Sequence, residues 1–147
     1  MGRLKLHQKI RMVMIVHRRI LRKNKVVYLL TAASPVKYKN GRSKIVYIGT
    51  TKKGASRIAE SAARRAEEIM STRGLKEVNV FVVSCNPRAG LATWKRLEDA
   101  LLVQFYSTYH EFPMCNDRGK KKWDKELDAL FKQKAIDKVL QRFERPA

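Results

Sequence analysis

Two runs of strand-forming residues, separated by a turn signal, place the strongest constraint on the fold of this chain. Val26–Leu30 and Lys44–Ile48 are rich in β-branched and aromatic residues, which favour the pleated, half-buried surface of a sheet. Between the two runs lie Pro35 and the pair Asn40-Gly41, and an Asn-Gly pair is typical of hairpin turns. We therefore expect the two runs to form a hairpin whose strands are joined by a long loop.

Helical periodicity and one more strand-like run account for most of the remaining chain. The third strand is expected at Val78–Val83, and the expected helices cover Leu4–Leu21, Ala55–Met70, Leu91–Tyr106 and Trp123–Phe143. Gly74 is placed where a left-handed residue ends the second helix. The order α-β-β-α-β-α-α predicts an α+β fold in which helices cover three strands. A chain of 147 residues favours a single domain, residues 1–147, with a basic N-terminal helix over 1–25 and an amphipathic C-terminal helix over 120–145.

The charge of the chain is large and unevenly distributed. The sequence holds 33 Lys and Arg against 13 Asp and Glu, which gives a formal net charge of +20. The 59 residues before Glu60 contain 16 of the basic residues and no acidic one. Such an asymmetry favours a polyanionic partner, either nucleic acid or an anionic membrane surface, and of the two we expect nucleic acid. The sequence leaves open a partner protein for targeting, and the oligomeric state.

Several other classes of protein are not expected. No apolar stretch approaches the ~18 residues of a membrane span, and no secretory signal is apparent. Cys85 and Cys115 are too few for a disulfide framework and lack the spacing of a zinc site. We therefore expect a cytoplasmic, nucleoid or nuclear protein that is neither secreted nor membrane-bound.

Glu98 is an unusual residue for its position. On the helix Leu91–Tyr106 it shares the apolar stripe of Trp94, Leu101 and Phe105, where a carboxylate is costly unless a cation, a metal or hydrogen bonds compensate it. Two interpretations stay open from spacing alone. Glu98 is either a functional metal ligand or acid–base group, or the structural ion-pair partner of an arginine.

Other candidate binding residues lie near the start of the helix Ala55–Met70. The preceding Gly49–Gly54 loop carries Lys52 and Lys53 and can present backbone N–H groups to a phosphate. Arg57 lies in the first turn of that helix, where the helix dipole favours an acid instead. Either a bidentate grip on phosphate or simple solvation explains Arg57.

Tyrosines occupy both strands of the expected hairpin, at Tyr28 and Tyr47. Strand tyrosines usually pack in the core or across strands. A phenol beside an arginine and a metal can instead have its pKa lowered and act as a base.

Taken in order, Val27-Tyr28, Tyr47-Ile48-Gly49, Arg57, Glu98 and Asn116 resemble the GIY-YIG nuclease superfamily. Arg57 follows Tyr47 by ten residues, which is the habitual spacing of that family. The resemblance extends over residues 26–116 and implies a three-stranded antiparallel sheet and an endonuclease that hydrolyses DNA phosphodiester bonds with a divalent metal. It implies five catalytic residues: Tyr28, Tyr47, Arg57, Glu98 and Asn116.

The resemblance also implies a role for each of these residues. Glu98 would hold one Mg²⁺ or Mn²⁺, and Arg57 would steady the scissile phosphate. Tyr47, helped by Tyr28, would orient or deprotonate the attacking water, and Asn116 would brace the site by hydrogen bonds. The residues expected to contact nucleic acid are Lys52, Lys53, Arg57, Ser61 and Arg64.

The sequence departs from the family pattern at two places. Val26-Val27 replaces the first Gly-Ile, and Ser61 stands where many members carry a histidine four residues after the arginine. A serine is not a base near neutral pH, although it can bond a phosphate oxygen. The alternative function is therefore a non-catalytic, basic nucleic-acid-binding module of the same fold.

Overall fold

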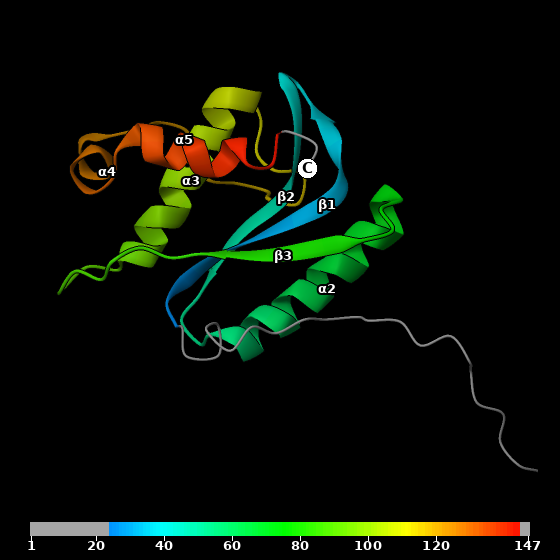
Figure 1. Ribbon diagram of the computed structural model, residues 1–147, viewed down its shortest axis with the longest axis horizontal. Coiled ribbons are helices and arrows are strands. Elements are labelled where there is room, and N and C mark those ends of the chain that lie inside the picture. Colours follow the sequence, from blue (N-terminus) through cyan, green and yellow to red (C-terminus); the bar gives the residue numbers. More distant parts are fainter. Residues whose placement is uncertain (1–23, 145–147) are drawn as a thin grey trace, which may run out of the picture.

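A three-stranded antiparallel sheet forms the centre of the protein (Figure 1). In the computed structural model, the described residues are 24–144, with the side chains of residues 72 and 73 excepted. The strands are β1 (Val26–Tyr38), β2 (Gly41–Thr51) and β3 (Val78–Val83), in the order β2-β1-β3. β2 and β3 are thus the edge strands. The predicted α+β class and its antiparallel sheet are confirmed.

The connection between β1 and β2 is a tight turn, so the prediction of a long loop is wrong. Only Lys39 and Asn40 separate the paired residues Tyr38 and Gly41. Gly41 has φ 101°, a conformation that favours glycine. β1 continues past Pro35 because the ladder register is irregular between Thr31 and Val36, and such an irregularity tolerates a residue with no N–H to donate.

Helices cover both faces of the sheet (Figure 1). α2 (Ala55–Arg73) lies on one face, while α3 (Thr93–Tyr109) and α5 (Gln133–Gln141) lie on the other, with α4 (Lys125–Leu130) beside them. α2 ends at Gly74, which has the predicted left-handed conformation with φ 66°.

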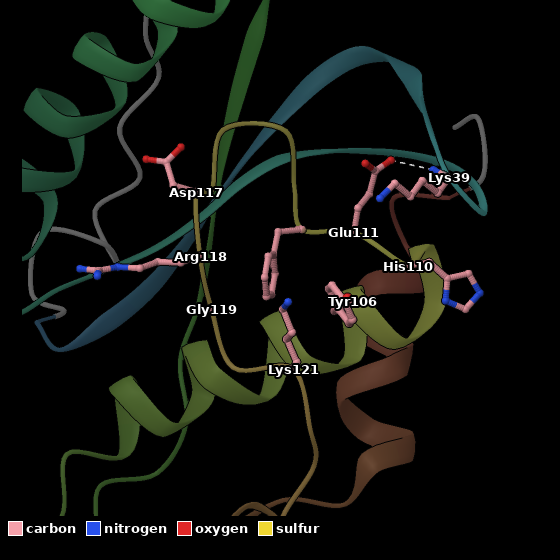
Figure 2. A pocket seen from close by; sticks show the side chains of 9 residues that line it. Lys39, Tyr106, His110, Glu111, Asp117, Arg118, Gly119 and Lys121 are labelled. Carbon is pink, nitrogen blue, oxygen red and sulfur yellow. Dashed lines mark hydrogen bonds between the residues drawn. The ribbon is translucent and has the colours of Figure 1, made fainter.

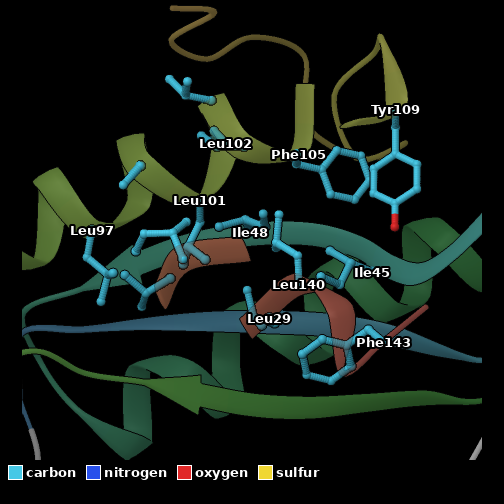
Figure 3. Close-up of a cluster of buried hydrophobic side chains, with 14 of the residues drawn as sticks. Leu29, Ile45, Ile48, Leu97, Leu101, Leu102, Phe105, Tyr109, Leu140 and Phe143 are labelled. Atoms are coloured by element: carbon cyan, nitrogen blue, oxygen red, sulfur yellow. The ribbon is translucent and has the colours of Figure 1, made fainter. Parts of the chain in front are cut away.

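Alternation along β1 divides the core into two clusters. Val27 and Leu29 pack toward α3 and α5, in a cluster that also contains Leu101 and Phe105 (Figure 3). Tyr28 packs on the opposite face, toward α2. Consecutive side chains of a strand point to opposite faces, so this buried central strand supports both clusters.

The expected single C-terminal helix over 120–145 is instead two short helices, α4 and α5. Phe131 and Lys132 between them have extended backbones. In a single continuous helix, the apolar stripe that includes Phe131 would also have buried Ala135, but Ala135 is exposed. The change of direction instead places Ile136 and Leu140 in the core with Leu127, so burial of apolar side chains overrides helical continuity.

The expected N-terminal helix over 1–25 lies outside the described residues except at its end. Within residues 24–144, no helix is both long and apolar enough to cross a bilayer.

Candidate functional site

Two tyrosines from neighbouring strands lie against each other on the face that α2 covers. Tyr28 of β1 is the ladder partner of Gly49 in β2, and Tyr47 lies two residues earlier on the same face of β2. The ring centroids are 5.9 Å apart and the rings are tilted by 44°. The structure thus brings together the two tyrosines that the sequence singled out.

Gly49 makes this arrangement possible because it has no side chain. A Cβ atom added there would lie 2.6 Å from Cε1 of Tyr47 and 3.0 Å from both Cζ and the hydroxyl oxygen of Tyr28. Real Cβ atoms essentially never show a contact as short as 2.6 Å, and a contact of 3.0 Å requires the neighbour to give way by a few tenths of an ångström. A side chain at position 49 would therefore displace the tyrosine rings.

The Tyr28 hydroxyl shares a hydrogen bond of 2.5 Å with Oγ of Ser61 on α2. Tyr28 is 3% exposed and Ser61 is 7% exposed. Buried hydroxyls need such partners, so Ser61 fixes the phenol of Tyr28. The expected contact between Ser61 and nucleic acid has no support here, because its hydroxyl is buried and used within the protein.

Arg65 is a site residue that the sequence interpretation missed. Its guanidinium carbon lies 4.8 Å from the ring centroid of Tyr47, and its Nη1 forms an ion pair of 3.1 Å with Glu68. Its Nε is buried without a hydrogen-bond partner among the described residues. The spacing held the signal, since Arg57, Ser61 and Arg65 are four residues apart and share one face of α2.

The expected nucleic-acid contact Arg64 lies beside Arg65 in sequence but is exposed. The two arginines therefore have different surroundings.

The surroundings of Tyr47 keep its phenol protonated. Burial raises the pKa of Tyr47, Tyr28 raises it further, and the positive charge of Arg65 opposes both without reversing the rise. At neutral pH Tyr47 is therefore a neutral phenol that donates or accepts a hydrogen bond. This environment favours orienting a water over removing its proton.

Glu98 of α3 is partly buried and forms no ion pair among residues 24–144. Oγ1 of Thr50 donates a hydrogen bond of 3.3 Å to its carboxylate. Burial raises the pKa of Glu98, although the Thr50 hydrogen bond and the charge of Lys95 oppose this. The structural ion pair with an arginine, one of the two sequence interpretations, is thus absent from the described part of the chain.

Glu98 and the tyrosine pair lie on either side of the edge strand β2. Thr50 alternates with Gly49 and shares the face of Ile48, which packs toward α3. The charge of Glu98 nevertheless contributes to the raised pKa of Tyr47. The two groups are therefore within electrostatic range around the free edge of β2.

The loop that contains Asn116 covers part of this free edge. Oδ1 of Asn116 accepts from the N–H of Ile48 and Nδ2 donates to the carbonyl of Ile48, each at 2.9 Å. The N–H of Cys115 donates to the carbonyl of Val46 at 2.9 Å. These bonds hold the strand that carries Tyr47 and Thr50.

The remaining predicted residues lie around this centre on the surface. Arg57 forms an ion pair of 2.9 Å with Glu60, and its side chain is 43% exposed. Exposed pairs contribute little stability, ~0–1 kcal/mol, so a phosphate can compete for this guanidinium. Lys52 and Lys53 are exposed in the loop before α2.

The available donors fit one kind of metal. No group of three or more His, Cys, Asp or Glu side chains is arranged to hold a metal within residues 24–144. Glu98 and the Thr50 hydroxyl offer hard oxygen atoms instead. Mg²⁺ often binds through one or two carboxylates, with water and substrate phosphates as its other ligands, so these donors fit Mg²⁺ or the similar Mn²⁺.

Two surface hollows border the loop that contains Asn116. One of about 350 Å³ opens at the end of α3 and is lined by Tyr106, His110 and Lys121 among others (Figure 2). There the N–H of Lys39 donates to the Glu111 carboxylate at 2.6 Å. A second hollow of about 360 Å³ includes Asn116.

No protein-family model, curated protein or solved structure matches this chain. The resemblance to the GIY-YIG nucleases therefore depends on the residues quoted above.

Proposed function

We propose that this protein is a metal-dependent endonuclease of the GIY-YIG type that hydrolyses phosphodiester bonds in DNA. The state of Glu98 carries the proposal. Although the chain has 33 basic residues, this partly buried carboxylate forms no ion pair in the described part of the chain. The single hydrogen bond from Thr50 offsets only part of the cost of burying this charge, and a divalent cation would offset it further.

In this proposal Glu98 holds Mg²⁺ or Mn²⁺, with Thr50 beside it. The metal, when bound, neutralises charge on the phosphate oxygens and makes a bound water more acidic. Tyr47 orients the attacking water by a hydrogen bond from its neutral phenol. Tyr28, held by Ser61, keeps the ring of Tyr47 in place.

The basic residues supply binding and charge stabilisation. Arg57 exchanges Glu60 for a phosphate and grips it by two hydrogen bonds. Lys52, Lys53 and Arg64 are exposed and contact the neighbouring phosphates. Asn116 positions the β2 segment through its two bonds to Ile48.

The direct test is incubation of the pure protein with supercoiled plasmid in Mg²⁺, in Mn²⁺ and in EDTA. We expect nicked or linear DNA with either metal and intact plasmid in EDTA. Binding is measured in EDTA on the same preparation. A protein that binds DNA but leaves it intact with both metals would contradict the proposal.

The alternative function, a non-catalytic nucleic-acid-binding module, has one specific observation in its favour. The raised pKa of Tyr47, together with Ser61 in place of a histidine, leaves the tyrosine pair without a neighbouring base among residues 24–144. The same plasmid experiment separates the two functions, because the alternative predicts binding without cleavage.

A further inference from the structure

A tryptophan with two lysines over its ring lies next to Glu98. Trp94 is in the first turn of α3, four residues before Glu98, so the two side chains share one helix face. The ammonium of Lys25, just before β1, lies 5.2 Å from the ring centroid of Trp94. The ammonium of Lys52, from the loop before α2, lies 5.9 Å from the same centroid.

Core packing does not account for this tryptophan. Trp123, the other tryptophan, packs against the core cluster that contains Leu101 and Phe105 of α3. Trp94 belongs to neither hydrophobic cluster of the described residues, and it is only partly buried. Its indole therefore has surface that the folded core leaves uncovered.

Ion pairing does not account for the two lysines either. Neither Lys25 nor Lys52 forms a salt bridge within residues 24–144. Each ammonium is attracted to the ring by a cation–π interaction, but two ammonium groups that converge on one ring also repel each other. Lys25 also has φ 52°, a left-handed conformation that is uncommon outside glycine. A ligand with negative charge on both sides of an aromatic group would satisfy this arrangement.

A nucleotide with an unpaired base has that chemistry. The flat face of a base stacks on an aromatic side chain, and the phosphates on either side attract lysines, so a bound nucleotide would take the place of the ammonium groups over the ring. In a duplex both faces of an internal base are already stacked on neighbouring bases, so duplex DNA offers only its phosphates.

We propose that Trp94, Lys25 and Lys52 form a subsite for an unpaired nucleotide next to the phosphate at Glu98. The substrate class is then DNA with a single-stranded or frayed segment at the cleavage position. The location beside the scissile phosphate depends on the proposed nuclease function, whereas binding of the unpaired nucleotide does not.

The test uses the fact that the chain has two tryptophans. In Trp123→Phe the fluorescence reports Trp94 alone, and in Trp94→Phe it reports Trp123 alone. Each protein is titrated in EDTA with oligothymidylate and with a blunt duplex of the same length. We expect oligothymidylate, and not the duplex, to quench Trp123→Phe, and neither DNA to quench Trp94→Phe. Equal quenching of Trp94 by duplex and single strand would overturn the proposal.

Affinity provides the second measurement. Stacking of one base contributes ~1–3 kcal/mol, so Trp94→Ala is expected to weaken oligothymidylate binding about tenfold or more and duplex binding less than about twofold. Lys53→Gln is the matched control for Lys52→Gln. Both substitutions remove one positive charge from an exposed lysine, but only Lys52 lies over the Trp94 ring.

We expect Lys52→Gln to lower the affinity for oligothymidylate more than Lys53→Gln does, with equal effects on duplex. Equal losses for the two lysine variants on oligothymidylate would overturn the subsite, even if Trp94→Ala failed to fold. Because all binding is measured in EDTA, failure of the subsite and absence of cleavage activity are separate results.

Discussion

Replacement of Gly49 by alanine is the perturbation whose consequence the structure defines most closely. The added methyl would lie 2.6 Å from Tyr47 and 3.0 Å from Tyr28. β2 is fixed by its ladder to β1, with Tyr28 opposite Gly49, so the rings must move instead. Tyr47 must move away, and Tyr28 must give way by a few tenths of an ångström, which weakens its 2.5 Å hydrogen bond to Ser61.

The size of the effect follows from these contacts. Overpacking costs ~1–3 kcal/mol, and weakening the buried hydrogen bond between Tyr28 and Ser61 costs up to about 1 kcal/mol more. The smaller entropy of the unfolded alanine chain returns about 0.4–1 kcal/mol. We therefore expect Gly49→Ala to lower the free energy of unfolding by about 2 kcal/mol, or roughly 8 °C in Tm at about 4 °C per kcal/mol.

Thermal melting followed by circular dichroism measures this change, and two further variants identify its cause. At Gly74 an added Cβ meets nothing within 4 Å but the φ is +66°, so Gly74→Ala is a backbone-only control with an expected cost of about 1–2 kcal/mol. In a Tyr47→Val background the cost of Gly49→Ala should shrink, because the nearest colliding atom is gone. A Gly49→Ala protein that melts within about 2 °C of the unmodified protein would refute the reasoning.

Four other predictions concern the edge of β2, the pH dependence of cleavage and of stability, and the salt dependence of DNA binding. Asn116→Ala should lower the free energy of unfolding by ~1–3 kcal/mol and speed hydrogen exchange at the Ile48 amide, because this amide loses its hydrogen-bond acceptor. Unchanged exchange at Ile48 would contradict the role of Asn116 in holding β2. Because the pKa of Glu98 is raised and metal binding needs its charged form, cleavage rates measured against pH should begin to fall at a higher pH than an ordinary glutamate would give. A pKa that is raised in the folded state stabilises the fold at low pH, and this stabilisation is lost as the pH rises through that pKa. The stability of Glu98→Gln relative to the unmodified protein should therefore be greater at neutral pH than at about pH 4. DNA affinity should fall by ~0.9 in log K per phosphate contact for each decade of salt; a flat salt titration would exclude phosphate-dominated binding.

Much of the fold could be predicted because it depends on local patterns. The strand Val78–Val83 was predicted with the bounds that it has, since β-branched residues bounded by turn signals fix such a run. The long stripe on α3 predicted the burial of Leu101 and Phe105. The motif Tyr47-Ile48-Gly49 drew attention to the tyrosine pair.

The features that the sequence did not predict depend on contacts between elements that are distant in the chain. The break at Phe131 depends on which side chains reach a core formed by distant elements, and local periodicity does not contain that information. In the sequence only the four-residue spacing from Ser61 distinguishes Arg65 from Arg64, and the rotation of α2 against the sheet is what places Arg65 over Tyr47. The raised pKa of Tyr47 likewise depends on burial and on neighbours from other elements.

The central claim, that Glu98 is a metal ligand of a nuclease, is tested most directly by Glu98→Gln. Glutamine keeps the shape and can still accept the hydrogen bond of Thr50, but it removes the charge. Single-turnover cleavage of DNA with saturating protein and Mg²⁺ is measured together with Tm.

The metal-ligand interpretation predicts a loss of at least ~10²-fold in the cleavage rate, with Tm unchanged or raised and DNA binding in EDTA preserved. A structural ion pair would instead cost ~3–5 kcal/mol when broken, so Tm would fall steeply. A Glu98→Gln protein that melts early and still cleaves at the normal rate while folded would contradict the claim.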